Sequence, residues 1–109
     1  MSTTTTLDTE RALDILADEE ARQILSILDQ PMTADEIAEE CGIPRSNAYR
    51  KLESLDDAGL VSDGIRLKPS GGHPVTYRRD FEAVNLSVGG DTLSLAVTRD
   101  HENRQASQE

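Results

Sequence analysis

Apolar residues follow helical spacing in the first part of the chain. Leu13, Leu16 and Ala17 indicate a short N-terminal helix. Asp18 can cap a second helix over 19–28. The inward positions of that helix, spaced i, i+3, i+4 and i+7, are Ala21, Ile24, Leu25 and Leu28. We expect this helix to end at 29–31, because Pro31 cannot continue the helical hydrogen-bond ladder.

Two further helices are predicted after Pro31. The segment 33–36 is a capping-box pattern, in which the Thr33 hydroxyl and the Glu36 carboxylate each accept a free backbone N–H. A helix over 34–41 follows, and Gly42 stands where a left-handed C-terminal cap is needed. After the turn 42–44, a third helix is predicted from about 45 to 58. Its inward stripe consists of Ala48, Leu52 and Leu55.

The second half of the chain alternates with the period of a β-strand. In 65–68 and 75–78 apolar and mostly basic positions alternate, so we expect a hairpin with one buried and one basic face, joined by a Gly- and Pro-rich loop over 69–74. A second alternating pair, 84–88 and 93–97, is joined by 89–92 and predicts another hairpin. We expect the polar tail from 100 to 109 to be disordered.

Two short helices joined by a three-residue turn, followed by a basic hairpin, are the order of a winged helix-turn-helix. The predicted fold class is therefore α+β, with a three-helix core and a β-hairpin wing. A short N-terminal helix and an additional C-terminal β-hairpin complete it. The expected organisation is a flexible segment 1–12, a winged helix-turn-helix domain 13–81, a hairpin 82–99 and a tail 100–109. A chain of 109 residues suits one such domain.

Charge is distributed unevenly along the chain. The formal net charge is −10, which by itself argues against binding a polyanion. The window 45–79, however, holds seven basic and four acidic residues and is therefore net +3. An acidic shell around a basic segment is typical of proteins that work at high salt, because surplus carboxylates keep a surface hydrated. We expect a halophilic source; an ordinary acidic surface face is the alternative that composition leaves open.

The third predicted helix, 45–58, has the polarity of a recognition helix. Opposite its apolar stripe the first half is polar and basic and the second half is acidic, so the first half would enter a major groove. Arg50 could bind guanine with two hydrogen bonds, and Asn47 could pair with adenine. The basic side chains of the hairpin would contact the DNA backbone or a minor groove. The predicted DNA-binding residues are Arg45, Ser46, Asn47, Tyr49, Arg50, Lys51, Arg66, Lys68, His73 and Arg78.

The segments 16–25, 33–43 and 47–61 resemble the ArsR-like winged helix-turn-helix regulators, in particular their haloarchaeal members. The resemblance covers about 13–79, and its most specific part is the run formed by Leu52, Leu55 and 58–61. It implies DNA contacts at 45–47 and 49–51, and a homodimeric repressor of transcription. The metal-sensing members carry a Cys-x-Cys motif, whereas this chain has only Cys41. No metal site is therefore expected.

Other function classes find little support in the sequence. No apolar run approaches the roughly 18 residues of a membrane span, and the start lacks a signal peptide, so a cytoplasmic location is expected. We see no nucleophile–base pair, metal cluster or phosphate-binding glycine loop, so neither an enzyme nor a cofactor nor a small-molecule ligand is expected. His73 and His101 lack metal-ligand spacing.

The C-terminal hairpin leaves two questions open. Its apolar stripe has to be covered, either by the N-terminal helix or by a second subunit, and we favour a symmetric homodimer. The alternative to a DNA-binding regulator is a protein–protein interaction module on the same scaffold. That alternative rests on the net charge of −10 and on the exposed strands of this hairpin.

Overall fold

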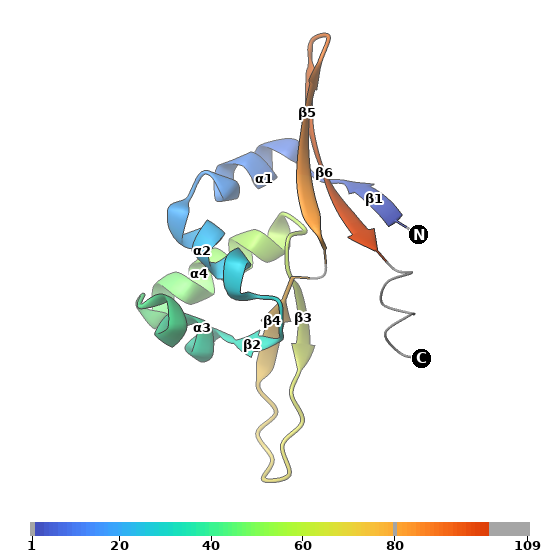
Figure 1. The fold of residues 1–109 in the computed structure, drawn as a ribbon. Helices are drawn as coiled ribbons and strands as arrows, with labels where there is room; N and C mark the ends of the chain where they lie inside the picture. The colour runs from blue at the N-terminus through green and yellow to red at the C-terminus, as the bar shows by residue number, and fades with distance from the viewer. Residues whose placement is uncertain (1, 80, 101–109) are drawn as a thin grey trace.

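The computed structural model describes residues 2–79 and 81–100, which form a mixed α+β fold (Figure 1). Within these residues the helices are α1 (Thr9–Leu16), α2 (Glu19–Ile27), α3 (Ala34–Cys41) and α4 (Arg45–Asp57). One antiparallel sheet has the order β2-β4-β3 and is built from β2 (Met32–Thr33), β3 (Ser62–Ile65) and β4 (Val75–Arg78). The other has the order β1-β6-β5 and is built from β1 (Ser2–Thr6), β5 (Ala83–Gly89) and β6 (Thr92–Asp100). This arrangement confirms the winged helix-turn-helix fold.

The predicted helix ends are set by the capping groups that the sequence indicates. Asp18 accepts a hydrogen bond from the backbone N–H of Ala21 at 2.9 Å. The Thr33 hydroxyl accepts from the Glu36 N–H at 3.1 Å, and the Glu36 carboxylate accepts from the Thr33 N–H at 2.9 Å, so the capping box is complete. Gly42 takes the left-handed conformation with φ 68°, which ends α3 and turns the chain into α4.

The core is organised around the inward face of α4. Ala48, Leu52 and Leu55 have no exposed surface, as predicted, and they pack in one cluster with buried residues of α1, α2 and α3. Leu95 and Val97 of β6 belong to the same cluster. The second sheet therefore closes the core on the side of α1, so the three-helix unit and the C-terminal hairpin share one hydrophobic core.

The N-terminal segment expected to be flexible contains regular structure. β1 pairs antiparallel with β6, with Thr4 opposite Thr98, and α1 begins at Thr9 behind the Asp8 cap rather than at Leu13. Threonine is β-branched and favours strands, and β6 offers a free edge for it to pair with. β6 runs to Asp100, where the tail was expected to begin, and residues 101–109 lie outside the described residues.

The first hairpin differs from its prediction in register and burial. β3 covers Ser62–Ile65 instead of 65–68, and Gly64 lies opposite Thr76. Ile65 is 65% exposed and Leu67 is 79% exposed, although both were expected to face inward. Thr76 is the buried residue of β4 instead. Figure 1 shows that the loop end of the hairpin extends past the helices, so the described elements leave these apolar side chains in solvent.

The apolar stripe of the C-terminal hairpin is only partly covered. Leu95 and Val97 are buried against the chain's own core, whereas Leu86, Val88 and Leu93 are exposed. In Figure 1 the end of this hairpin projects beyond α1. We call the hairpin formed by β5 and β6 the arm. Within the described residues, its outer half has nothing packed on it.

The position of Leu52 in the core predicts a large effect of its truncation. We expect Leu52→Ala to lower the free energy of unfolding by about 2–5 kcal/mol, because the change leaves a cavity in a site with no exposed surface. Leu67→Ala is the matched control and should change it by less than about 0.5 kcal/mol, since this side chain is mostly in solvent. Urea unfolding followed by circular dichroism measures both. Equal effects of the two substitutions would contradict the proposed packing of α4.

Candidate nucleic-acid interface

The first half of α4 presents a polar surface that the other described elements leave largely exposed. Arg45, Ser46, Tyr49 and Arg50 are exposed, and Asn47 is half-buried. Ser46 and Arg50 lie opposite the buried stripe, and Asn47 and Tyr49 lie on its flanks, as the helical spacing predicts. The Ile43 N–H donates to the Ala38 carbonyl at 3.0 Å, which fixes the tight turn that leads from α3 into α4. The turn therefore holds the beginning of α4 at the edge of the domain.

Arg50 and Asn47 lie one turn apart on α4 and contact each other. The Arg50 Nη2 donates to the Asn47 Oδ1 at a distance of 3.4 Å, which is long for a hydrogen bond. Among the described residues Arg50 has no ion-pair partner within 4.0 Å. Arg50 is one of the residues that line a hollow between α1 and α4, together with Asp14, Asp18 and Asp57. Both side chains can therefore be redirected toward a ligand at little cost.

Lys51 is placed differently from its neighbours. Its Nζ lies 2.8 Å from an oxygen of Asp18 and 3.9 Å from one of Glu20, and its side chain is 13% exposed. The hydrogen bond from Lys51 and a second one from the Ala21 N–H lower the pKa of Asp18. Lys51 thus ties α4 to the first turn of α2, and its charge is used within the chain.

Arg45 forms a surface ion pair. Its Nε lies 2.6 Å from Asp35 Oδ1, and both side chains are more than half exposed. A hydrogen bond with Tyr49, followed by the charge of Asp35, raises the pKa of Arg45 above its usual value. Exposed pairs of this kind contribute little net stability, so Arg45 can exchange the carboxylate for another anion.

Arg66 joins the first hairpin to α3. Its Nη1 lies 2.9 Å from Glu36 Oε2, its Nη2 lies 3.1 Å from Glu36 Oε1, and Nη2 also donates to the Pro31 carbonyl at 3.2 Å. The hydrogen bond from Arg66 is the main cause that lowers the pKa of Glu36 to about 2, and the hydrogen bond from the Thr33 N–H is the second. The hairpin prediction placed Arg66 on the outward face. In the structure its guanidinium is engaged by α3.

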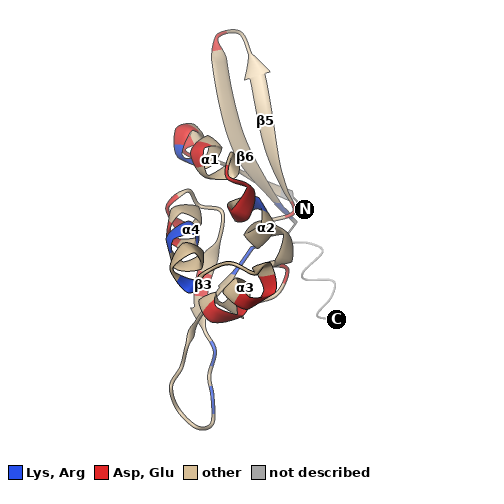
Figure 2. Ribbon diagram, turned by 90° about the vertical axis from the view of Figure 1, so that its left-hand side faces the viewer, with Lys and Arg blue, Asp and Glu red and all other residues tan. Residues whose placement is uncertain are grey.

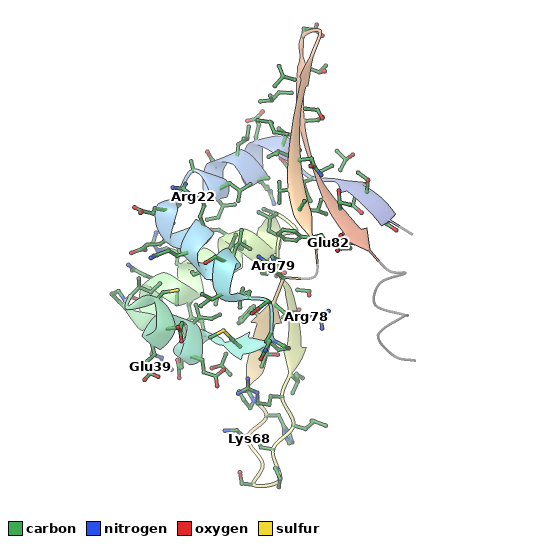
Figure 3. All side chains as sticks on the ribbon, viewed as in Figure 1. Arg22, Glu39, Lys68, Arg78, Arg79 and Glu82 are labelled. Carbon is green, nitrogen blue, oxygen red and sulfur yellow. The ribbon has the colours of Figure 1, made fainter. Side chains whose placement is uncertain are left out.

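The outer part of the hairpin keeps its charges exposed. We call β3, β4 and the loop 66–74 between them the wing. Lys68 and His73 are exposed in the loop, where the Lys68 N–H donates to His73 Nδ1 at 3.3 Å, and Arg78 is exposed on β4 (Figure 3). The segment 64–79 contains four Lys or Arg and no Asp or Glu. The wing is therefore basic in an acidic chain.

Figure 2 shows how the charges are sorted over the fold. The ribbon is coloured for basic residues on α4 and on the wing loop, with further ones on α1 and α2, whereas the charged residues of α3 are all acidic. The second half of α4 is acidic as well, through Glu53, Asp56 and Asp57. The structure thus brings the beginning of α4 and the wing together as two basic surfaces bordered by carboxylates.

Sequence reasoning gave no special role to Arg79, which has a structural one. Its backbone N–H donates to the Leu28 carbonyl at 2.9 Å, its Nη1 donates to the Leu25 carbonyl at 3.1 Å, and its guanidinium lies 5.9 Å from the centre of the Phe81 ring. Arg79 satisfies carbonyls at the end of α2. No local signal could reveal this, because its partners lie about fifty residues earlier in the chain.

Other kinds of site are not indicated by the geometry. In residues 2–79 and 81–100, no three His, Cys, Asp or Glu side chains are grouped so that they could hold a metal ion. Burial raises the pKa of the Cys41 thiol, which disfavours the reactive thiolate. None of the helices in the described part of the chain has the length and apolar character needed to cross a membrane.

Comparison with known proteins gives a consistent picture. Residues 16–63 match the family model described as a helix-turn-helix domain. A crystal structure from Mycobacterium bovis, described as a possible transcriptional regulatory protein (fragment 1–100), is 30% identical; the match covers 64% of this chain and 71% of that one, with a TM-score of 0.53. A possible transcriptional regulator from Methanosarcina mazei is 13% identical, covers 64% of this chain and 62% of that one, and has a TM-score of 0.52. The latter supports the fold alone. No curated protein matches the sequence.

The contact between Glu36 and Arg66 predicts how stability depends on pH. The pKa of Glu36 is about 2 in the folded chain against an ordinary value of 4.5, so its stabilisation is present above pH 4.5 and is lost as the pH falls toward 2. Glu36→Gln should therefore be less stable than the wild type at neutral pH, and this difference should shrink between pH 4.5 and 2. Urea unfolding at a series of pH values measures it.

The matched control for this experiment is Glu39→Gln. Glu39 lies one turn after Glu36 on α3 (Figure 3) and lines a hollow together with Arg66, but the ion pair and hydrogen bonds of Arg66 go to Glu36, so replacing Glu39 changes the net charge equally and leaves that pair in place. If both variants showed the same pH-dependent loss, the effect would come from net charge and not from the link between α3 and the wing.

Proposed function

This chain belongs to the helix-turn-helix domain family, and from that premise we propose that it is a DNA-binding transcriptional regulator, a dimeric repressor that reads the major groove with α4. The observation that carries the proposal is the sorting of charge. In a chain of net charge −10, the wing has no acidic residue over 64–79, and it lies next to the polar and basic first half of α4. Phosphate neutralisation requires such a surface.

The base-reading part of the proposal concerns the beginning of α4. A helix fits the major groove, and in this fold its leading end approaches the base edges. Arg50 is the first candidate, because it is exposed and has no ion pair among the described residues. Asn47 lies one turn earlier and can present its amide to adenine. Ser46 and Tyr49 complete the exposed face.

Backbone contacts come from a different set of residues. We assign Lys68, His73 and Arg78 of the wing to phosphate or minor-groove contacts, because their side chains are exposed. Arg45 joins them by exchanging Asp35 for a phosphate near the beginning of α4, where free N–H groups favour an anion. Lys51 and Arg66 were in the sequence-predicted set. Because both are engaged by carboxylates of the chain, we propose that they position α4 and the wing instead.

The acidic residues outside the interface affect the salt concentration at which the chain would bind DNA. High salt screens the repulsion between these carboxylates and DNA, together with the attraction of the basic side chains for phosphate. We propose that the protein works at high salt, because surplus carboxylates keep its surface hydrated there, in keeping with a halophilic source. Selection of bound sequences from a random duplex library in multi-molar and then moderate KCl tests the whole proposal. Enrichment of a two-fold-symmetric motif is expected; no enrichment at either salt would favour the protein-interaction alternative.

Two substitutions separate base reading from phosphate binding. Arg50→Ala should cost about 1–3 kcal/mol of binding free energy and relax the base preference at one position of each half-site, because a bidentate contact to guanine is lost. Lys68→Ala should weaken binding to all sequences alike and reduce the slope of affinity against salt by about one. Fluorescence anisotropy with the selected motif and single-base variants of it measures both. Equal, sequence-independent losses would make Arg50 another phosphate contact.

A further inference from the structure

The outer strand of the arm has a free edge. In the sheet order β1-β6-β5, β5 pairs only with β6, so one row of its backbone N–H and C=O groups has no strand partner among the described residues. β5 is exposed along nearly its whole length, with only Val84 half-buried. An open edge of this kind is a template for pairing with another strand. Natural proteins usually protect such an edge with charges or proline.

β5 lacks that protection. Between residues 83 and 98 the only charged side chain is Asp91, in a chain that is 29% charged overall. Leu86 and Val88, together with Leu93 of β6, form the exposed apolar part of the arm. They continue the same face that buries Leu95 and Val97 against α1, because Leu86 lies opposite Leu95 and Val88 opposite Leu93. The covered part of the face therefore extends without a break into the uncovered part.

The sequence of β5 is self-complementary. Val84-Asn85-Leu86-Ser87-Val88 has the same order of apolar and polar residues from either end. If two copies of β5 pair antiparallel about a two-fold axis at Leu86, then Leu86 meets Leu86 of the partner and Val84 meets the partner's Val88. Polar Asn85 meets the partner's Ser87 on the other face. All apolar residues thus stay on one face of the joined sheet, as cross-strand pairing requires.

We propose that a second copy of this chain occupies the arm, and that the two β5 edges join into one six-stranded antiparallel sheet of order β1-β6-β5-β5-β6-β1. This inference rests on the proposed dimeric regulator and names its interface. Charge favours a second copy there: two chains of net charge −10 repel each other, and the nearly uncharged arm is where they can approach. The antiparallel arrangement also brings the exposed end of one arm beside the base of the other, where α1 packs.

Site-specific crosslinking tests the pairing. In a Cys41→Ser background, Leu86→Cys places one thiol of each copy at the two-fold axis, so a short thiol-specific crosslinker should give covalent dimers in high yield. Thr4→Cys, at the middle of β1, reports on pairing through the opposite edge of the sheet, and Ser70→Cys in the wing loop reports on random collisions. Crosslinking at Thr4 but not at Leu86, or equal yields at all three positions, would overturn the proposal.

Sedimentation of charged variants gives the second test. Leu86→Lys should raise the dimer dissociation constant at least about tenfold, because it removes an apolar pair and sets like charges against each other. Leu67→Lys, at a position that is also exposed but lies in the wing, is the matched control and should leave the dimer unchanged; circular dichroism verifies that both variants are folded. An unchanged dissociation constant for Leu86→Lys would overturn the interface.

Measuring the affinity for a duplex with a single half-site distinguishes a failure of this interface from a failure of the proposed function. If Leu86→Lys loses the dimer, it should still bind one half-site duplex with the affinity of a wild-type monomer, because α4 and the wing are untouched. A folded wild type that binds no DNA at any salt would instead remove the proposed function and leave the crosslinking result standing on its own.

Discussion

The burial of one face of α4 is the constraint on which the rest of this structure depends. Ala48, Leu52 and Leu55 lose all their exposed surface, and such burial stabilises each large side chain by about 1.5–3 kcal/mol. A helix has only one rotation about its axis that places this stripe inward. The same rotation turns Arg50 outward, so the core that stabilises the fold also selects the surface presented to a ligand.

Two charge contacts then hold the periphery at fixed positions relative to that core. Lys51 connects α4 with the first turn of α2 through Asp18, and Arg66 connects the base of the wing with α3 through Glu36. Glu36 serves twice, because the carboxylate that completes the capping box of α3 also accepts two hydrogen bonds from Arg66. The geometry between the wing and α4 therefore depends on a helix cap. Lys51 and Arg66 therefore act as parts of the scaffold, because their charges fix the positions of α4 and the wing.

The sequence was most informative where local chemistry determines structure. Helical spacing, the Thr33 capping box and the left-handed Gly42 could be interpreted locally, and α3 was predicted with its bounds as observed. The failures concern pairings over long distances. Nothing near the N-terminal threonines signals that β6 lies beside them, and alternation in 65–68 could not reveal that the wing extends beyond any covering element. For the candidate site, spacing identified the exposed face of α4, but the engagement of Arg66 thirty residues from Glu36 required the fold.

An acidic chain and a polyanionic ligand are compatible only if charges are sorted by element. The carboxylates are concentrated on α1, α2, α3 and the second half of α4, and 64–79 has none. The arm differs from both the acidic helices and the basic wing, because it carries almost no charge of either sign. The acidic helices repel both DNA and a second copy of the chain. The wing attracts phosphate, whereas the arm lacks the charge to bind a polyanion but can pair with a strand. This segregation keeps the proposed DNA surface and the proposed self-association surface apart on one core.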